Sequence, residues 1–475
     1  MTRRLADVDG LRESYDLVIV GAGPAGMAAA SEASGHGCSV LVLDENPRPG
    51  GQIYRAIGAA PLRRPEVLGA AYWEGAALAE AFAAAEVDYL PGATVWHLDD
   101  ALEIGVSAGA RSAVIPARRV ILATGALERP MPVRGWTLPG VMTVGAGQTL
   151  LKAQGIAPTG RVVLAGCGPL LWLYAAQCVA AGAAPSLVLE TTPRANWRGA
   201  LRHLPAFLTT PYARKGLALM ARVRRHVRVV SGVRALAVDQ EGDALRVTWD
   251  EGAGFLADHV LLHQGVVPNL NLARAAGCSV AWDEGNACFV PVADAWGNAS
   301  VSGIAVAGDG AGVAGAESAA LRGRLAALEA LRALGVLDEA GRDARAAPHR
   351  AALARWSRGR AFLDALYRPA PQFRAAPPDA IACRCEEATG AAVREAARMG
   401  AAGPNQLKAF LRCGMGPCQG RMCGPTITET IAQERGVHPG EVGYLRLRTP
   451  VKPITLGEFA ALRKTEADVK AVERR

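Results

Sequence analysis

Five cysteines near the C-terminus are spaced as the ligands of a metal centre would be. Cys383 and Cys385 form a C-x-C pair, and Cys413, Cys418 and Cys423 lie in the glycine-punctuated stretch LRCGMGPCQGRMCG. A four-thiolate centre uses four of these five, whereas a disulfide framework needs an oxidising compartment. Because the charged start of the chain, MTRRLADVDGLRESYD, predicts no secretory signal, we expect metal or redox chemistry.

Two short helical patterns separate the cysteine loops. They are GAAVREAARMG and PNQLKAFLR, and Pro404 suits the first turn of the second one. This layout brings the C-x-C and C-x4-C segments together. Four thiolates can hold a [2Fe-2S] cluster or a structural zinc ion. The nearby Gly414, Gly416, Gly420 and Gly424 expose backbone N–H groups that can hydrogen-bond to sulfur.

The N-terminal segment YDLVIVGAGPAGMAAASEASGHGCSVLVLDENPRPGGQ has the pattern of a dinucleotide-binding unit. A predicted strand is followed by G-x-G-x-x-G at the start of a helix, and a second predicted strand ends in Asp44. Gly21 allows the tight turn, Gly23 lets backbone N–H groups approach a pyrophosphate, and Gly26 lets helix and strand pack closely. Asp44 can accept hydrogen bonds from the ribose hydroxyls of an adenosine.

A second unit of this kind begins at Arg161 but departs from the pattern. Gly166 and Gly168 are present, Leu171 replaces the third glycine, and Glu190 takes the place of the ribose acid. The uncharged residues 162–189 are numerous enough to span a bilayer, yet their glycines and prolines favour a buried βαβ unit. A leucine side chain crowds the phosphate approach, so we expect no NAD(P) here.

Three separated pieces resemble the two-dinucleotide-domain flavoproteins, which include glutathione and thioredoxin reductases. The pieces are the first glycine motif with its acid, Ala-Thr-Gly after the strand RRVIL, and Gly-Asp before a helix near Gly315. The resemblance implies FAD, or another adenine nucleotide, at the first site. Its predicted binding residues are Gly21, Pro24, Ala25, Gly26, Gly23, Asp44, Glu45, Gly51, Gln52, Ala123, Thr124, Gly125, Gly308 and Asp309.

The resemblance also implies the fold class and the domain order. We expect an α/β protein with two Rossmann-like domains of the glutathione-reductase kind, the second inserted in the first, and a small helical C-terminal domain. The predicted division is 1–155 with 265–335 for the dinucleotide domain, 156–264 for a degenerate inserted domain, 336–378 for a helical and extended proline-rich linker, 379–430 for the cysteine domain, and 431–475 for a tail.

The cysteine domain resembles the bacterioferritin-associated-ferredoxin-like [2Fe-2S] domain. Matching C-x-C and GMGPCQGRMC implies that Cys383, Cys385, Cys418 and Cys423 are the ligands, with Cys413 as a spare. A flavin in the same chain favours this electron carrier over zinc. The reductases carry a reactive cysteine pair beside the flavin, whereas GGQIYR has none, so we expect no disulfide exchange.

Nearly the whole chain, including LERPMPVRGW, GAGQTLLKAQG and RLRTPVKPITLGEFAAL, resembles the α subunits of bacterial amine, opine and hydroxyproline dehydrogenase or oxidase complexes. Relatives include the octopine and nopaline oxidases, hydrogen cyanide synthase and sarcosine oxidase. The resemblance implies an electron-transfer subunit in a hetero-oligomer. Its partner, a D-amino-acid-oxidase-like β subunit with its own FAD, would oxidise the C–N bond of an amino or imino acid, and an FMN can lie between the subunits.

Two alternatives stay open. A self-sufficient NAD(P)H-dependent flavin and iron–sulfur reductase would need a working second nucleotide site. Leu171, in place of the third glycine, argues against such a site. A scaffold that only anchors a partner would not need four placed cysteines. The sequence assigns no catalytic residue, because its histidines are scattered; His263, before the predicted return to the first domain, is the one to watch.

Composition limits the classes of partner. Half of the 475 residues are apolar, and the net charge is +8. Almost all of the basic residues are arginines. Since no dense basic run lies beside aromatic residues, we expect a solvated surface and no nucleic-acid binding. We also expect no transmembrane segment and a cytoplasmic location.

Overall fold

The computed structural model describes residues 1–62 and 64–464. An eight-stranded sheet forms the first body, in the order β1-β4-β3-β2-β7-β6-β5, with β20 also paired to β7. Its central strand β2 runs parallel to β3 and β7 and is almost wholly buried, as expected of a sheet covered on both faces. The strands are β1 (Arg3–Arg4), β2 (Tyr15–Val20), β3 (Val40–Asp44), β4 (Asp88–Pro91), β5 (Thr94–Leu98), β6 (Glu103–Ala108), β7 (Arg111–Leu122) and β20 (Ile304–Val306).

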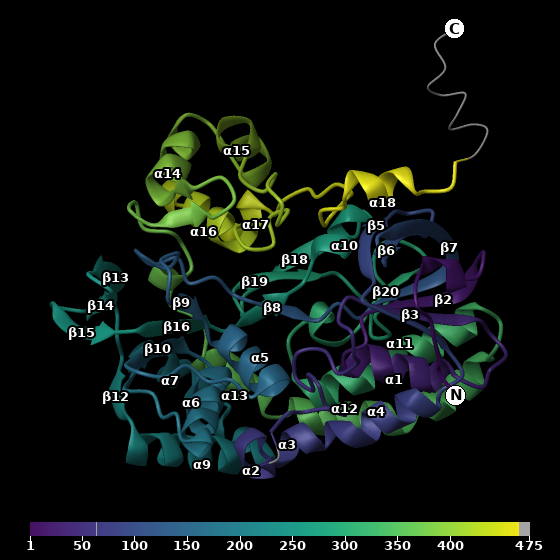
Figure 1. Ribbon diagram of the computed structural model, residues 1–475, viewed down its shortest axis with the longest axis horizontal. Helices are drawn as coiled ribbons and strands as arrows, with labels where there is room; N and C mark the ends of the chain where they lie inside the picture. Colours follow the sequence, from purple (N-terminus) through teal and green to yellow (C-terminus); the bar gives the residue numbers. More distant parts are fainter. Residues whose placement is uncertain (63, 465–475) are drawn as a thin grey trace, which may run out of the picture.

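The return of the chain to this sheet is marked by close helix packing. Helix α1 (Pro24–Ala33) lies against α11 (Ala316–Ala333), some three hundred residues later (Figure 1). A Cβ on Gly323 would stand 2.1 Å from the carbonyl oxygen of Ala25, so only glycine allows this approach. The other helices of the first body are α2 (Pro65–Leu68), α3 (Ala70–Trp73), α4 (Gly75–Ala84), and the 3-10 turns at Val8–Gly10 and Gly308–Ala311.

The second body is a parallel five-stranded sheet, β12-β11-β10-β16-β9. It includes the uncharged 162–189 segment, which forms strand, helix and strand as predicted. No described helix is both long and apolar enough to cross a membrane. Its elements are β9 (Val141–Thr143), α5 (Val144–Gln154), β10 (Val162–Cys167), α6 (Pro169–Ala181), β11 (Leu187–Glu190), α7 (Arg194–Leu201), α8 (Leu204–Leu208), α9 (Pro211–His226), β12 (Arg228–Ser231) and β16 (His259–Gln264).

Smaller sheets complete the two bodies. The crossings between them, β8 (Ala126–Glu128) and β17 (Val266–Pro268), pair antiparallel with each other. An antiparallel sheet of β13 (Leu236–Glu241), β14 (Ala244–Trp249) and β15 (Ala253–Ala257) flanks the second sheet. After the return crossing come α10 (Asn271–Ala275) and the hairpin β18 (Val280–Asp283) and β19 (Cys288–Pro291).

The connection to the C-terminal domain differs from the extended linker that its prolines predicted. Helices α12 (Glu339–Ser357) and α13 (Arg360–Leu366) are followed by a 3-10 turn at Pro371–Phe373. Ala370 and Phe373 are buried in the same core cluster as the second sheet. Proline restricts the backbone, but these apolar side chains gain more by burial than an extended spacer would allow.

The C-terminal domain is a small helical unit (Figure 1). Its core contains Val393, Leu407, Ile427 and Ile431, and it docks through a bond from the Trp136 indole Nε1 to the Ile381 carbonyl, 2.7 Å. Its elements are β21 (Ile381–Cys383), β22 (Ala388–Thr389), α14 (Gly390–Arg398), α15 (Pro404–Leu411), α16 (Gly424–Arg435) and α17 (Pro439–Val442).

The predicted tail returns to the first body. Val451 is buried in its core, and α18 (Leu456–Ala460) follows on the surface. Residues 465–475 of this tail lie outside the described residues. The domain boundaries themselves stay predictions.

Candidate cofactor sites

The first glycine loop is packed as the dinucleotide pattern predicts. A Cβ on Gly26 would stand 1.7 Å from the Gly21 carbonyl oxygen, and one on Gly21 would stand 2.4 Å from the Ala123 carbonyl oxygen. Gly51 has a φ of +58°, and its Cβ would lie 2.9 Å from the Gly23 Cα. The predicted residues at 21–26, 51 and 123 therefore meet around one open backbone surface, which is where a pyrophosphate needs to approach.

Asp44 is held at the end of β3. Its carboxylate accepts hydrogen bonds from the backbone N–H groups of Ala22 and Asn46, while burial raises its pKa. Next to it, Glu45 forms an ion pair with Lys452 of the C-terminal tail. The tail thus supplies a cation beside the predicted ribose acid, a contact that no sequence motif indicated.

The Ala-Thr-Gly and Gly-Asp pieces also come together. A Cβ on Gly310 would lie 3.5 Å from the Gly125 carbonyl oxygen and 3.6 Å from the Thr124 hydroxyl. The adjacent Asp309 accepts a hydrogen bond from the Ala314 backbone N–H, 2.9 Å, where α11 begins. The predicted residues 123–125 and 308–309 therefore share one edge of the first sheet.

The turn at Gln52 is held by a hydrogen bond from a buried lysine, Lys152. Lys152 donates to the Gln52 carbonyl oxygen, 3.1 Å, and to the Gln148 side-chain oxygen, 2.9 Å. Burial, together with the charge of Arg55, lowers the pKa of Lys152 to about 7. Lys152 holds the turn that the resemblance assigns to the flavin, and only its place in GAGQTLLKAQG pointed to it.

The second crevice, at the carboxyl end of β10 where a nucleotide would bind in the second body, contains part of the chain itself. The Cys167 thiol, in the second glycine loop, donates to the Tyr367 carbonyl oxygen, 3.7 Å. The Asn196 amide nitrogen donates to the carbonyl oxygens on either side, those of Leu366 and Arg368, at 2.9 and 2.8 Å. Segment 366–368 thus crosses the carboxyl end of β10, where a nucleotide phosphate would bind in a working site. Leu171 lies fully buried beneath it.

His263 pairs with a glutamate of the other crossing. Its Nδ1 lies 2.6 Å from Glu128 Oε1, and Glu128 Oε2 accepts a hydrogen bond from the Gly145 backbone N–H. His263 is buried, and a Cβ on Gly166 would collide with its carbonyl oxygen. The His263–Glu128 pair therefore links the second glycine loop to the crossing strand β8, and His263 does not face solvent.

The five cysteines of the two C-terminal loops lie close together. Cys383 interacts with Cys413 and Cys423, and Cys418 interacts with Cys423 and Cys385. The assignment of Cys383, Cys385, Cys418 and Cys423 as ligands stays a prediction.

Hydrogen bonds to sulfur tune these thiols. Bonds from Cys413 and Cys423 lower the pKa of Cys383 to about 2, and a bond from Cys423 lowers the pKa of Cys418 to about 5. Backbone N–H groups add to this effect: that of Gly414 bonds to Cys383, and that of Gly420 bonds to Cys418. Two of the four predicted glycines therefore direct their N–H groups at predicted ligands.

A hydrogen-bonded connection joins the two predicted cofactor sites. The Asn269 backbone N–H donates to the Gly125 carbonyl oxygen, 3.0 Å, at the first site. Two residues later, Asn271 Nδ2 donates to the Gln419 carbonyl oxygen, 3.0 Å, between two predicted cluster ligands. Asn271 is buried, and its bond to Gln419 is partly buried. Figure 1 shows α10 lying between the C-terminal domain and the first sheet.

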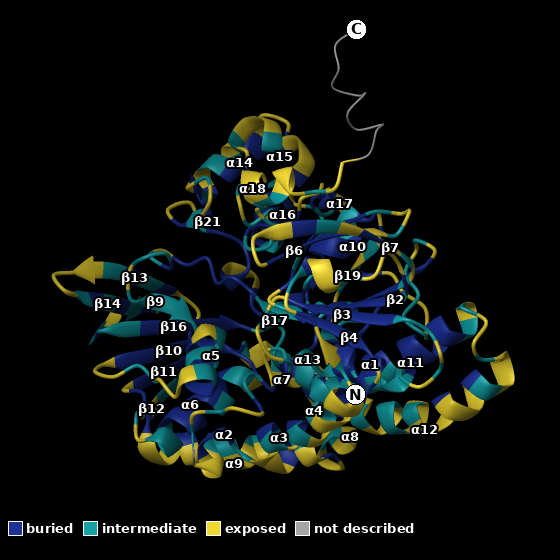
Figure 2. Cartoon of the chain, turned by 45° about the vertical axis from the view of Figure 1, so that its right-hand side comes forward, coloured by how far each residue is buried: buried dark blue, intermediate teal, exposed yellow. Residues whose placement is uncertain are grey.

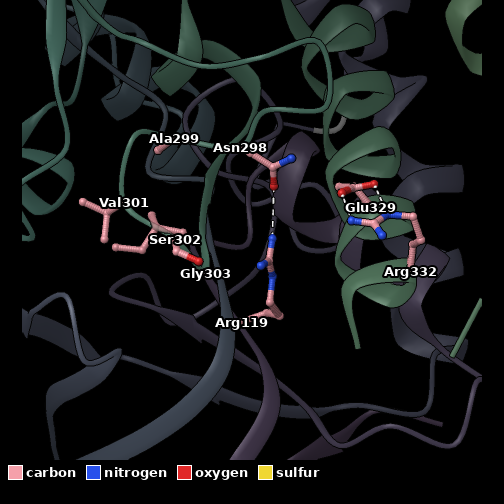
Figure 3. A pocket seen from close by; sticks show the side chains of 9 residues that line it. Arg119, Asn298, Ala299, Val301, Ser302, Gly303, Glu329 and Arg332 are labelled. Atoms are coloured by element: carbon pink, nitrogen blue, oxygen red, sulfur yellow. Dashed lines mark hydrogen bonds and ion pairs between the residues drawn. The ribbon is translucent and has the colours of Figure 1, made fainter. Parts of the chain in front are cut away.

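One cavity outside these sites has a volume of about 190 Å³ (Figure 3). Arg119 donates to the Asn298 side-chain oxygen at its wall, and Arg332 pairs with Glu329. It is smaller than ligand pockets usually are, and its lining includes no predicted cofactor residue.

Comparison with known proteins places this geometry in a family. Residues 15–327 match the pyridine nucleotide-disulphide oxidoreductase family, and residues 381–433 match the BFD-like [2Fe-2S] binding domain. The chain is 50% identical to the A-type subunit of opine oxidase from Agrobacterium tumefaciens, over 99% of this chain and 96% of that protein. The chain belongs to the family of opine oxidase A-type subunits.

More distant relatives agree. Hydrogen cyanide synthase subunit HcnB of Pseudomonas aeruginosa is 32% identical over 94% of this chain and 98% of its own length. The structure of L-proline dehydrogenase from P. horikoshii superposes with a TM-score of 0.69 at 18% identity, covering 96% of this chain and 80% of that one. This confirms the predicted α/β flavoprotein fold with its C-terminal iron–sulfur domain.

This chain is therefore an oxidoreductase, and its cofactors are FAD and a [2Fe-2S] cluster. The residues present fit both groups. The first site offers a tightly packed glycine loop at the N-terminus of α1, and the C-terminal loops offer an all-thiolate donor set with N–H groups directed at sulfur. The individual binding residues stay predictions.

Proposed function

We propose that this chain is the electron-transfer component of a complex that oxidises the C–N bond of an amino or imino acid in a partner β subunit. The observation that carries the proposal is the connection from Gly125 through Asn269 and Asn271 to Gln419. It joins the first dinucleotide site to the cluster loop within one hydrogen-bonded stretch. FAD, when bound, accepts electrons in pairs and releases them singly, which an iron–sulfur cluster can then carry.

The proposed substrate class is that of opines, proline and hydroxyproline. The name of the opine oxidase A-type relative supports the opine part of this class. That relative and HcnB are each named as subunits, which supports a partner subunit. The proposed partner is a D-amino-acid-oxidase-like β subunit with its own FAD, and an FMN between the subunits belongs to the same proposal.

The second crevice is proposed to take no NAD(P)H, since segment 366–368 crosses it and Leu171 lies beneath. The self-sufficient reductase therefore has no observation in its favour. A cytoplasmic location is also proposed: all ten cysteines are free, which suits a reducing compartment.

The test compares the isolated chain with the chain coexpressed with its β subunit. The isolated chain should not bleach its flavin quickly with NADH or NADPH in stopped-flow absorbance, and should not oxidise opines or proline. Adding the β subunit should give amine-dependent reduction of a dye. Rapid NADH reduction of the isolated chain would overturn the proposal in favour of the self-sufficient reductase.

A further inference from the structure

Residues 443–452 form a strap that runs from the C-terminal domain back to the first body (Figure 1). Its side chains Leu445, Leu447 and Val451 are buried, whereas α18 after it lies on the surface and leaves 89% of Leu456 exposed (Figure 2). The strap is therefore anchored by its own apolar side chains. Each end of it reaches one of the two predicted cofactor sites.

The first end of the strap packs on the cysteine loop, residues 413–423. The Leu445 side chain is fully buried there. A Cβ on Gly420 would stand 2.3 Å from Leu445 Cδ1, and a Cβ on Gly414 would stand 3.0 Å from Leu445 Cδ2. The backbone N–H groups of Gly414 and Gly420 bond to Cys383 and Cys418 respectively. Leu445 therefore supports the backbone that donates to two predicted cluster ligands.

The second end of the strap is fixed to the first body. The Val451 backbone N–H donates to the Trp96 carbonyl oxygen of β5, 2.8 Å, and the Val451 side chain lies in the core of the first body. Only residues 446–450 separate this anchor from Leu445. The short reach of such a segment limits how far one anchor can move without the other.

Lys452, the next residue, places a cation beside the predicted ribose acid. It pairs with Glu45, and its side chain is 22% exposed. Burial lowers the pKa of Lys452, while the negative charge of Asp44 opposes that shift, so the ammonium and the Asp44 carboxylate lie within electrostatic reach of each other. An ammonium has three N–H donors, and the pair with Glu45 accounts for one of them. The others can serve an acceptor that is bound at Asp44.

We propose that Lys452 is a further binding residue for the adenosine ribose of FAD, and that the strap transmits the occupancy of this site to the cysteine loop. When FAD is bound, its ribose hydroxyls lie at Asp44, and Lys452 donates to one of their oxygens. This bond holds the strap in place and keeps Leu445 against the loop. Linkage is reciprocal, so a closed loop also favours retention of FAD. The proposal rests on the predicted cofactor residues and needs no partner subunit.

The first test measures FAD release from the full chain with both cofactors, as the rise in flavin fluorescence after dilution. Lys452→Gln removes the charged donor, so release should be roughly tenfold faster than in the parent chain. Lys452→Arg keeps a cation with N–H donors and should restore most of the retention. The matched control is Lys464→Gln, which removes the same charge from an exposed residue of the same tail, beyond the strap, and should release FAD like the parent.

The second test measures hydrogen–deuterium exchange over residues 413–423 before and after FAD release. FAD should slow exchange there in the parent chain, and should do so much less in Lys452→Gln. The Asn271 bond to Gln419 is intact in that variant, so the comparison isolates the strap. Leu445→Ala alters no predicted nucleotide residue and should still speed FAD release. Because both variants act through one strap, the double variant should release FAD little faster than either single variant.

The absorbance of the cluster is recorded for every variant to show that the C-terminal domain is assembled. Lys452→Gln changes a partly exposed side chain, so it decides the proposal even if Leu445→Ala fails to assemble its cluster. Parent-like FAD release in Lys452→Gln, equal acceleration in Lys464→Gln, or no rescue by Lys452→Arg would each overturn the proposal. So would additive effects in the double variant, or equal protection of the loop by FAD in Lys452→Gln and the parent. None of these measurements involves the β subunit, so their failure leaves the proposed function standing.

Discussion

Removal of the Asn271 side chain should loosen the cluster loop without removing the cluster. In the native chain, Asn271 Nδ2 donates to the Gln419 carbonyl oxygen at 3.0 Å, and the residue is buried. Asn271→Ala leaves that carbonyl without its donor. None of the predicted ligands is altered, so cluster content should stay close to that of the parent chain.

The expected size follows from the partial burial of this bond. A typical intramolecular hydrogen bond contributes about 0.5–1.5 kcal/mol. The C-terminal domain keeps its other attachments, including the Trp136 bond to Ile381 and the buried Arg374–Glu429 pair, so the cost falls on local opening of the loop. At about 1.4 kcal/mol for each factor of ten, opening should become roughly two- to tenfold more frequent.

Hydrogen–deuterium exchange over residues 413–423 measures this opening directly. Exchange there should speed up by that factor, while exchange in α14 and α15 should not. Reduction of the cluster by the flavin should also slow, because a loosened loop spends less time docked on the first site. The control is Asn405→Ala on the exposed surface of the same domain, which removes an amide bond to the Tyr444 carbonyl at 3.2 Å and a bond accepted from the Arg446 backbone N–H at 2.8 Å. Unchanged exchange in Asn271→Ala, or an equal change in the control, would refute the proposed role of this contact.

Cys418→Ser should abolish the [2Fe-2S] signal in electron paramagnetic resonance after reduction, whereas Cys413→Ser should keep it; the opposite result would show that the ligand assignment is wrong. Asp309→Ala should lower FAD occupancy, since a lost hydrogen bond to a charged group costs about 1.5–3 kcal/mol, and unchanged flavin content would contradict this. The pKa of Lys152, lowered to about 7, means that the fold loses stability as pH falls from about 10 toward 7. Urea unfolding of Lys152→Met should show a flatter pH dependence in that window, and an identical slope would count against the buried charge. Leu171→Gly should not gain affinity for NADH, because the linker still crosses the crevice; measurable binding by calorimetry would show that Leu171 alone is the obstacle.

The features that the sequence predicted are local ones. The turn around Gly21 and Gly26, the strand that ends in Asp44, and the C-x-C pair are each defined by a few neighbouring residues. Their backbone conformations follow from sterics and hydrogen bonding over short distances.

What could not be predicted depends on contacts between distant segments. The prolines near Pro371 indicated an extended linker, yet Phe373 is buried beside the second sheet and Tyr367 crosses the second crevice. The pairing of Lys452 with Glu45 joins residues about four hundred positions apart.

The occupied second crevice has a consequence for the order of folding. Strand β16 completes the second sheet at Gln264, but the segment that fills the crevice, around Tyr367, is synthesised about a hundred residues later. At about 5–20 residues per second, the ribosome leaves this crevice open for roughly 5–20 seconds. During that interval, segment 366–368 does not yet cover Cys167 and the surrounding apolar groups. The newborn chain is therefore most exposed to thiol oxidation and to aggregation after the second sheet has formed and before α13 has reached it.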